Sequence, residues 1–383
     1  MDDKFLIMPA PLWPPENHMA EWTDSHLSRA RQVVGRFGDC TVTIAVFMRR
    51  PVLAATRVAV DWLNSILTAR QSDADIIERF AEGQWVGAGE PLMYITGSFL
   101  HLADIETLFL MKLGSACVAA YNADAMCQSM PGCAFMAMDG RHCAGTEMAD
   151  LMAYAAAVGS GRARRKAGAI GFVGNTTDAT AHYFGNERGA GGVCHALVGY
   201  AGSTVRAAEM YHETWPEQPL TVPVDYFGHE VTDALALCRK FPALAAEGRL
   251  TLRLDTPATR FMEALDPQKC YDILDHYAPQ SVRGYYSLEE LAYLTGPGVS
   301  AAAVWTLREK LNDAGFDKVK IAASSGFCPA KCKVIAEAQA PIDLVITGAF
   351  LPERWPETHA AADIIAYGGE GRVRSGREFL QRR

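Results

Sequence analysis

The chain has 383 residues, enough for two domains of about 150 residues each, and 49% of its residues are apolar while 21% are charged. This composition excludes an intrinsically disordered chain and supplies material for a large core. The basic and acidic residues, 36 and 44 in number, give a net charge of −8, which argues against bulk attraction to nucleic acid or to an anionic membrane.

We expect no segment that directs the chain into or across a membrane. The first residues, Met1 to Lys4, lack the basic and apolar regions of a secretory signal, and no run of about 18 apolar residues occurs. The ten cysteines are scattered at a density too low for a disulfide scaffold. The closest pair, Cys328 and Cys332, has no second pair nearby, so we expect no metal site there. A reduced, cytoplasmic protein is the simplest interpretation.

The first 130 residues mix strand and helix patterns. Residues 40–48 (CTVTIAVFM) are rich in β-formers, and residues 91–97 (PLMYITG) follow a glycine-rich turn. Residues 103–130 then carry a long apolar pattern that suits a buried helix. These patterns predict a mixed α/β domain at the front of the chain.

From about residue 146, helices and strands alternate. The expected helices cover residues 146–158, 202–215, 230–246, 300–315 and 330–339. The expected strands cover residues 167–172, 220–225, 250–255, 318–323 and 342–347. Such alternation predicts a parallel sheet with crossover helices, and this number of units suits either a barrel or a doubly wound sheet. The last thirty residues, roughly, are expected to return to the first domain as a sheet element.

Polar or small residues follow several of the expected strands. They are Asn175 to Asp178, Asp225, Asp255 with Thr256, Ser324 to Gly326, and Thr347 with Gly348. Each could be a helix N-cap or a turn, and Asp255 could cap a helix after Pro257. In a parallel barrel, however, the carboxyl ends of the strands share the face that holds the active site. Carboxylates, hydroxyls and glycine amides that meet there suit a ribose carrying phosphates.

Two further residues have unusual surroundings. His195 closes the segment Arg188-Gly-Ala-Gly-Gly-Val-Cys-His195, which has three glycines. A histidine in an apolar setting is more often a core residue than a catalyst, but these glycines favour a functional histidine because they let a ligand or the backbone come close. Arg253 lies within a buried strand on the same face as Asp255, where an unpaired guanidinium would be costly.

Several of these segments, in order across residues 134–350, match the motifs of one family. They are Asp139–His142, Gly171–Thr176, Gly191–Leu197, Val224–Asp225, Arg253–Pro257, Lys320–Gly326 and Asp343–Gly348. A weaker match covers the front of the chain, at Thr23–Asp24, Phe47–Arg49, Glu90–Pro91 and Glu106–Thr107. The sequence thereby resembles the nicotinate phosphoribosyltransferases, and most of all their shorter, archaeal-type branch.

The resemblance implies an α/β fold with an irregular parallel α/β barrel and a discontinuous N-terminal α/β domain. The N-terminal domain would cover residues 1–133, joined by residues 352–383, and the barrel would cover residues 134–351. Members of the family are homodimers whose active sites are shared across the subunit interface. They join nicotinate to 5-phosphoribosyl 1-diphosphate, which gives nicotinate mononucleotide and diphosphate for NAD biosynthesis. Mg²⁺ accompanies the substrate diphosphate, and ATP is a co-substrate through a transient phospho-histidine.

Carried over to this sequence, the resemblance implies roles for residues around the base. His195 would be the phosphorylated histidine, and Asp225 would orient its imidazole. Arg141 would bind the nicotinate carboxylate with two donors. Thr176 stands where members that use the acid have a serine and relatives that use the amide have an aspartate, which favours nicotinate over nicotinamide. His26 stands where a tyrosine commonly stacks on the pyridine.

A second set of residues is implied for the sugar and its phosphates. Arg253 and Asp255 would hold the phosphoribosyl group, with Asp255 on the ribose hydroxyls. The 5-phosphate would bind at two loops, Ser324-Ser325-Gly326 and Thr347-Gly348. Arg49 would reach the diphosphate bound by the neighbouring subunit.

The sequence departs from the family pattern at three places. Gly191-Gly192 replaces Gly-Thr, which removes one hydroxyl, and the phosphate loop reads Ile346-Thr347-Gly348-Ala349 in place of Gly-Val-Gly-Thr. The C-terminal cysteine cluster of the archaeal-type branch is absent, so we expect no zinc. Two alternatives stay open: a related transferase that acts on nicotinamide or quinolinate, and a non-catalytic ligand-binding homologue, which the altered phosphate loop favours.

Overall fold

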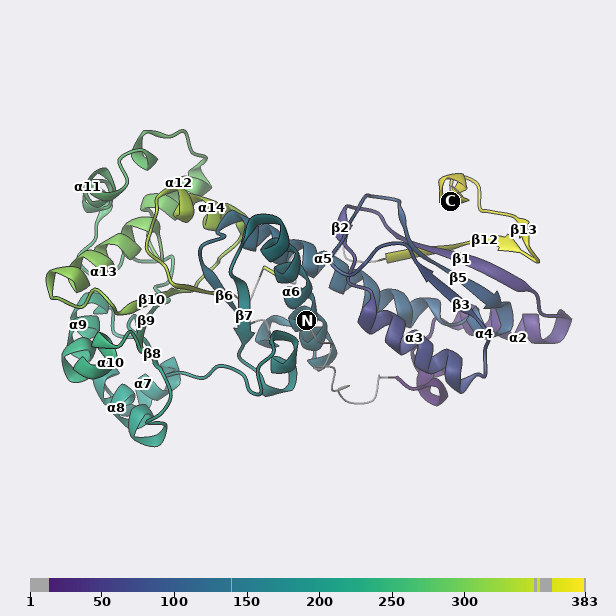
Figure 1. The fold of residues 1–383 in the computed structure, drawn as a ribbon, viewed down its shortest axis with the longest axis horizontal. Coiled ribbons are helices and arrows are strands. Elements are labelled where there is room, and N and C mark those ends of the chain that lie inside the picture. Colours follow the sequence, from purple (N-terminus) through teal and green to yellow (C-terminus); the bar gives the residue numbers. More distant parts are fainter. Residues whose placement is uncertain (1–13, 139, 348–349, 352–359, 382–383) are drawn as a thin grey trace. The chain divides into compact units, whose positions relative to one another are not determined.

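The computed structural model describes residues 14–138, 140–347, 350–351 and 360–381, and the chain forms two compact units (Figure 1). Unit 1 consists of residues Met1–Asp124, His142–Arg162 and Leu351–Arg383, and unit 2 of residues Ala125–Arg141 and Ala163–Phe350. These units differ from the expected domain boundaries mainly at residues 142–162, which belong to unit 1. The helix expected over residues 146–158, which was assigned to the barrel domain, therefore belongs to unit 1.

Unit 1 is built on a five-stranded antiparallel sheet. Its strands are, in spatial order, β13 (Glu370–Gly371), β12 (Ala360–Tyr367), β1 (Thr41–Met48), β5 (Pro91–Ser98) and β3 (Asp75–Glu78). A separate two-stranded ribbon pairs β2 (Val52–Leu53) with β4 (Trp85–Val86). Because β12 pairs along the whole length of β1, the expected return of the C-terminal residues to this sheet is confirmed.

Both faces of this sheet are apolar. Successive side chains along β1 point to opposite faces, and buried side chains occur on both. On one face Ala45 and Phe47 pack against the C-terminal residues, and the rings of Phe47 and Phe379 meet edge to face with centroids 5.8 Å apart. On the other face Ile44 and Val46 line a groove of about 680 Å³. The groove is completed by three helices, α2 (Ser25–Phe37), α4 (Phe99–Leu102) and α5 (Glu106–Ser129).

The helices of unit 1 come from both ends of the chain. They are η1 (Glu16–His18), α1 (Met19–Trp22), α2 (Ser25–Phe37), α3 (Arg57–Ala69), α4 (Phe99–Leu102), α5 (Glu106–Ser129), α6 (Thr146–Ala167) and η6 (Glu378–Gln381), the last residues of α5 and α6 belonging to unit 2. No helix within the described ranges combines the length and the apolar character that a bilayer crossing requires.

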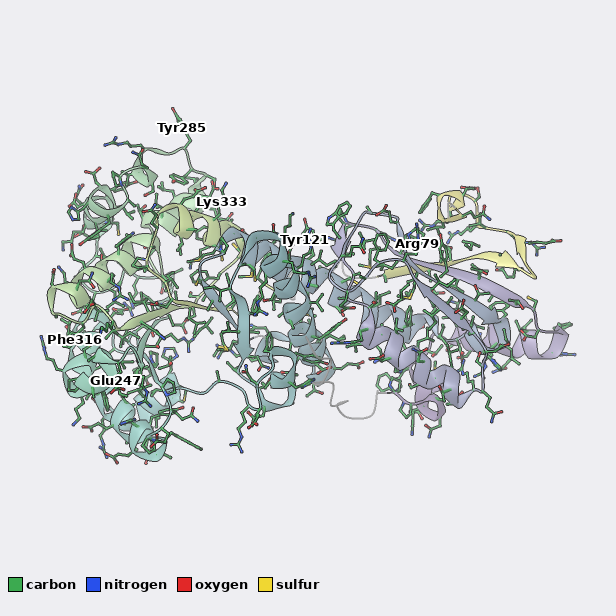
Figure 2. The ribbon with its side chains drawn as sticks, viewed as in Figure 1. Arg79, Tyr121, Glu247, Tyr285, Phe316 and Lys333 are labelled. Atoms are coloured by element: carbon green, nitrogen blue, oxygen red, sulfur yellow. The ribbon has the colours of Figure 1, made fainter. Side chains whose placement is uncertain are left out.

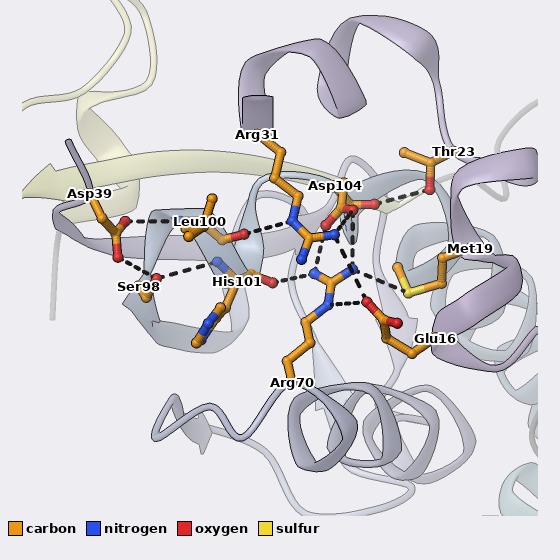
Figure 3. A network of polar contacts seen from close by, with 10 residues as sticks. All are labelled: Glu16, Met19, Thr23, Arg31, Asp39, Arg70, Ser98, Leu100, His101 and Asp104. Carbon is orange, nitrogen blue, oxygen red and sulfur yellow. Dashed lines mark hydrogen bonds and ion pairs between the residues drawn. The ribbon is translucent and has the colours of Figure 1, made fainter. Parts of the chain in front are cut away.

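A buried ion-pair network fixes the turn before α5 (Figure 3). The Asp104 carboxylate accepts hydrogen bonds from both Nη atoms of Arg70, at 2.6 and 3.1 Å, and from Arg31 at 3.1 Å. Glu16 contacts Nε of Arg70 at 3.1 Å, and the Thr23 hydroxyl donates to the Asp104 carbonyl at 3.1 Å. These contacts tie the N-terminal helices and α3 to the start of α5, and they satisfy a carboxylate that is 3% exposed.

Unit 2 is a parallel α/β barrel. Its strands are, in spatial order, β7 (Gly171–Asn175), β6 (Ala134–Ala137), β11 (Leu344–Thr347), β10 (Lys320–Ala323), β9 (Leu250–Leu254) and β8 (Leu220–Pro223). Every neighbouring pair in this order is parallel. Except for β7 and β8, each strand neighbours the next one along the chain, and the last strand, β11, lies beside the first, β6. The order is therefore cyclic, which confirms the barrel and excludes the doubly wound alternative.

Helices lie on the outer side of these strands (Figure 1). Those between strands are η2 (Gly140–His142), η3 (Asp178–Phe184), α7 (His195–Ala201), α8 (Thr204–Thr214), α9 (Glu230–Lys240), α10 (Pro242–Ala246), α11 (Pro267–Tyr277), η4 (Ser281–Arg283), α12 (Leu288–Thr295), α13 (Ala301–Asp313) and α14 (Pro329–Glu337). The helix expected over 230–246 ends at Lys240 and restarts at Pro242, since proline has no amide proton for the helix ladder.

One irregularity of the barrel lies between β7 and β8, which do not pair with each other in the described part of the chain. The glycine-rich segment before α7 spans this interval. Ala190 N donates to the carbonyl of Asn175, the last residue of β7, at 2.7 Å. Val193 N donates to the carbonyl of Thr221, in β8, at 2.9 Å. The segment thus links the two strands that would otherwise be open edges.

Candidate active site

His195 and Asp225 are in direct contact. His195 is the first residue of α7, and Asp225 follows β8. Nε2 of the imidazole lies 2.9 Å from Oδ1 of the carboxylate, and the two side chains are 36% and 9% exposed. An ionised carboxylate only accepts hydrogen bonds, so Nε2 carries a proton, and in the neutral imidazole Nδ1 keeps the lone pair. Nδ1 has no hydrogen-bond partner among the described residues.

The charges around His195 favour its protonated form. The hydrogen bond that the imidazole donates to Asp225 raises the pKa of His195 above its usual value, although partial burial of the ring opposes this. The charges of Arg253 and Asp255 also act on the imidazole, with opposite signs. The histidine pair and the Arg253–Asp255 pair are therefore close enough to form one electrostatic site.

The glycines before His195 are required by close backbone approaches. A Cβ at Gly189 would lie 2.6 Å from the backbone carbon of Thr176, and one at Gly192 would lie 3.2 Å from the Thr221 carbonyl oxygen. Any other residue at Gly189 would push this segment away from the end of β7. The sequence-based expectation that these glycines allow a close approach of the backbone is confirmed.

Arg253, Asp255 and Ser324 form a second chain of contacts at the carboxyl ends of β9 and β10. Arg253, 8% exposed, forms an ion pair with Asp255, and its Nε donates to the Ser324 hydroxyl at 3.0 Å. The Ser324 hydroxyl donates in turn to the carbonyl of Leu254 at 3.2 Å. The interpretation of Asp255 as a helix N-cap is wrong, because the next helix, α11, begins only at Pro267 and is capped by Asp266.

The loop after β10 has an unusual backbone. Ser325 and Gly326 both have positive φ, 76° and 64°, and only glycine adopts this region without strain. Ser324 is buried, Ser325 is half-buried and Gly326 is exposed, so the loop rises from the barrel to its surface. The N–H groups of Ser325 and Gly326 have no hydrogen-bond partner among the described residues, so they are available to an anion.

The remaining predicted residues of unit 2 lie after other strands of the same sheet. Arg141 is exposed in η2, after β6, and its closest polar contact is the sulfur of Met138 at 3.6 Å. Thr176 is half-buried directly after β7. Thr347, at the end of β11, is 3% exposed, and its hydroxyl has no partner in the part of the chain that the structure describes. Gly348 lies outside the described residues.

Two predicted residues belong to unit 1. His26 is exposed in the first turn of α2, and Arg49 is exposed directly after β1. The residues named above at the barrel strands belong to unit 2. The resemblance assigns His26 and Arg49 to a site shared between subunits, and that assignment stays a prediction.

Arg260 and Lys331 were not expected from the sequence. Arg260 donates to the Asp225 carbonyl at 2.9 Å and pairs with the fully buried Glu230 at 2.6 Å, so it holds the turn that carries Asp225. Lys331 is buried on α14 beside the Ser324–Gly326 loop. Lys331 could have been found from its helical spacing: it lies three residues before Val334 and therefore on the apolar face of the helix.

The arrangement suits the binding of a charged, hydroxylated ligand. It offers carboxylates for hydroxyl groups, an imidazole with one free nitrogen, and a loop whose amides are available to an anion. No group of three or more His, Cys, Asp or Glu residues in the described ranges is placed to hold a metal ion.

Comparisons with known proteins give similarity in structure alone. No family model matches the chain, and no curated protein matches its sequence significantly. Among solved structures, nicotinate-nucleotide pyrophosphorylase from Pyrococcus furiosus has a TM-score of 0.71 at 19% identity, over 96% of this chain and 81% of that one. The Ehrlichia chaffeensis protein of the same description has a TM-score of 0.58 at 11% identity, over 91% and 96% of the two chains.

A third solved structure is human nicotinic acid phosphoribosyltransferase, with a TM-score of 0.58 at 14% identity, over 92% of this chain and 76% of that one. The chain shares the fold of these enzymes. The match extends over nearly the whole chain in each case, and it includes the α/β barrel that carries the candidate site.

Proposed function

We propose that this protein is a phosphoribosyltransferase of NAD metabolism that joins nicotinate to 5-phosphoribosyl 1-diphosphate. One observation carries the proposal. Asp225, Asp255 and Ser324 follow the carboxyl ends of three neighbouring parallel strands, and His195 and Arg253 are hydrogen-bonded to them. The fold that the chain shares with a nicotinic acid phosphoribosyltransferase and with nicotinate-nucleotide pyrophosphorylases supports it.

The proposed reaction needs positioning more than a protein nucleophile. The pyridine nitrogen of nicotinate forms a bond to C1 of the sugar while the bond from C1 to diphosphate breaks. Positive charge grows on the sugar ring, and negative charge grows on the departing diphosphate. Mg²⁺ would arrive bound to that diphosphate and offset its charge. The protein would hold both substrates in line and provide fixed charges around them.

Each part of the substrates has a proposed partner. Asp255 would accept hydrogen bonds from the ribose hydroxyls, and Arg253 would keep that carboxylate in place. The Ser324–Gly326 loop would receive the 5-phosphate. Arg141, exposed and with no ion pair to a described residue, would bind the nicotinate carboxylate, beside Thr176. His26 and Arg49 would come from the other subunit of a homodimer.

ATP would be used through His195. The lone pair on Nδ1 would attack the γ-phosphorus of ATP, so that a nitrogen–phosphorus bond forms as the bond to ADP breaks. Asp225 would keep the proton on Nε2 and so offset the positive charge that develops on the ring. The hydrogen bond between His195 and Asp225 is the observation that supports this use of ATP.

One observation favours a second candidate. The Pyrococcus furiosus structure, with the TM-score of 0.71, is described as a nicotinate-nucleotide pyrophosphorylase. In that case the base would be quinolinate, which has one carboxylate more than the product mononucleotide. The extra carboxylate would leave as carbon dioxide, and ATP would not be needed.

A substrate panel tests both candidates. Purified protein is incubated with 5-phosphoribosyl 1-diphosphate, Mg²⁺ and one of nicotinate, quinolinate or nicotinamide, with and without ATP, and products are measured by mass spectrometry. We expect nicotinate mononucleotide from nicotinate, formed faster with ATP. His195→Ala should abolish the stimulation by ATP, whereas replacement of the exposed His276 on α11 should leave it intact. Product from quinolinate with release of carbon dioxide would favour the second candidate, and no turnover by folded protein would contradict both.

A further inference from the structure

Lys331 is a buried lysine beside the proposed phosphate loop. It lies in the first turn of α14 and is 6% exposed. Its Nζ donates to the Ser325 carbonyl oxygen at 2.6 Å, which is the one acceptor that the described residues supply to this ammonium. The rings of Phe327 and Tyr293 flank the ammonium, with centroids 4.6 and 5.8 Å from Nζ.

This position is unfavourable for a charged group. Burial lowers the pKa of Lys331 to about 8, although the negative charge of Asp255 acts in the opposite direction. The other buried residues of α14 are Cys332, Val334 and Ile335, none of which is charged. An apolar side chain would fill the same space without the cost of burying an ammonium. The lysine therefore suits a role that uses its charge.

The loop is held from two sides by cations. From β9, Arg253 donates to the Ser324 hydroxyl at 3.0 Å, and from α14, Lys331 donates to the Ser325 carbonyl. A trans peptide unit directs its carbonyl and its amide proton to opposite sides. Because the Ser325 carbonyl faces Lys331, the Gly326 N–H is directed away from Lys331. That N–H has no hydrogen-bond partner in the described ranges, and Gly326 is exposed.

We propose that Lys331 is a positioning residue of a phosphate subsite: it holds the Ser325 carbonyl so that the Gly326 N–H faces a phosphate oxygen. The hydrogen bond stabilises the left-handed backbone at Ser325, which is unfavourable for a residue other than glycine. The buried positive charge also attracts a phosphate dianion across a region of low dielectric constant. The proposal rests on the proposed function in taking this loop as the 5-phosphate site.

Binding of ribose 5-phosphate by calorimetry at pH 7 tests the proposal on three variants. Lys331→Met should weaken binding roughly tenfold or more, because a hydrogen bond to a charged group is lost. Lys331→Arg should recover part of the affinity. Lys333→Met is the matched control, since Lys333 lies on the same helix, is exposed and contacts Glu337 at 3.8 Å (Figure 2). It should leave binding unchanged.

The pH dependence provides a second readout. Wild-type affinity for ribose 5-phosphate should fall severalfold from pH 7 to pH 9, as Lys331 loses its proton near pH 8. The titratable groups around it are Asp255 after β9, Tyr293 on α12, Cys328 directly before α14 and Cys332 on α14; burial raises the pKa of Tyr293 and of Cys332. Lys331→Arg should show a flatter profile, because arginine stays charged.

The outcomes separate this proposal from the proposed function. Undiminished ribose 5-phosphate affinity in Lys331→Met would overturn it, and so would a wild-type protein that does not bind this ligand. An equal rise in the KM for nicotinate, together with a lower unfolding temperature, would indicate a structural role and would also overturn it. A wild-type protein that binds ribose 5-phosphate but converts no base would contradict the proposed function alone, and the comparison of variants would still decide the role of Lys331.

Discussion

The proton on Nε2 of His195 is held by Asp225, and this hydrogen bond determines when the other ring nitrogen is free to react. The bond raises the pKa of His195. Below that pKa both ring nitrogens are protonated, so Nδ1 has no lone pair for a phosphoryl group. Above it, Nδ1 is free while Nε2 keeps its proton. Under the proposed function the ATP-stimulated rate should therefore rise with pH through a pKa that lies above the usual histidine value.

Replacing Asp225 by asparagine tests this dependence. Loss of the carboxylate charge lowers the pKa of His195 toward its usual value, so the acid limb of the ATP-stimulated rate should move to lower pH. The maximal rate should fall roughly tenfold or more, because an amide fixes the ring and offsets its charge less well. The measurement is a pH–rate profile with and without ATP. The control is Asp233→Asn, because Asp233 accepts a hydrogen bond from Thr204 and does not contact His195. An acid limb at the same pH in both proteins would contradict the assignment of the pair.

Single residues could be predicted from the sequence where a short-range rule applied. Arg253 and Asp255 were placed on one face by the period of a strand, and in the structure the two side chains form an ion pair. Arg260 and Lys331 were not found, because each acts on the site through a main-chain carbonyl: that of Asp225 in the β8–α9 turn for Arg260, and that of Ser325 beyond β10 for Lys331. Main-chain carbonyls leave no mark in a sequence, so contacts to them cannot be deduced from residue types.

Among the elements, the segment before α7 decides the shape of the barrel. It has no regular structure of its own, yet it bonds to β7 through Ala190 and to β8 through Val193. The strand expected over residues 250–255 and the helix expected over residues 300–315 were predicted close to their observed positions. The helix expected over residues 146–158 continues to Ala167, and the strand expected over residues 167–172 lies at Gly171–Asn175. β6 was not predicted from the sequence, although the equally short strands β8, β10 and β11 were. The bridging segment was recognised only by its glycines, because a pair of long-range backbone contacts has no periodic signature.

Gly189→Ala tests the bridge between β7 and β8. The added Cβ would lie 2.6 Å from backbone atoms of Thr176 and Thr177, which cannot move aside as a flexible side chain can. We expect a loss of about 1–3 kcal/mol in the free energy of unfolding, measured with urea, together with weaker turnover. Gly132→Ala is the control: a Cβ there meets nothing within 4 Å, so stability should stay equal or rise slightly. Equal stability of both variants would show that the close approach is not required.

At the scale of the whole molecule, the cyclic order of the six parallel strands brings the ends of β8, β9 and β10 side by side. The sequence could predict alternating strands and helices, but not their cyclic order, since a doubly wound sheet has the same local pattern. The division of the chain into two units could likewise not be predicted from local sequence patterns. Residues 142–162 follow a barrel strand along the chain but pack in unit 1.

The central claim is that the strand ends of unit 2 bind the phosphoribosyl group. Amide hydrogen exchange, measured by mass spectrometry with and without 5-phosphoribosyl 1-diphosphate and Mg²⁺, tests it most directly. The account predicts slower exchange in peptides that cover residues 253–256 and 324–327, with unchanged exchange in α11 and α13, on the outside of the barrel. No ligand-dependent protection, or protection confined to those outer helices, would contradict it.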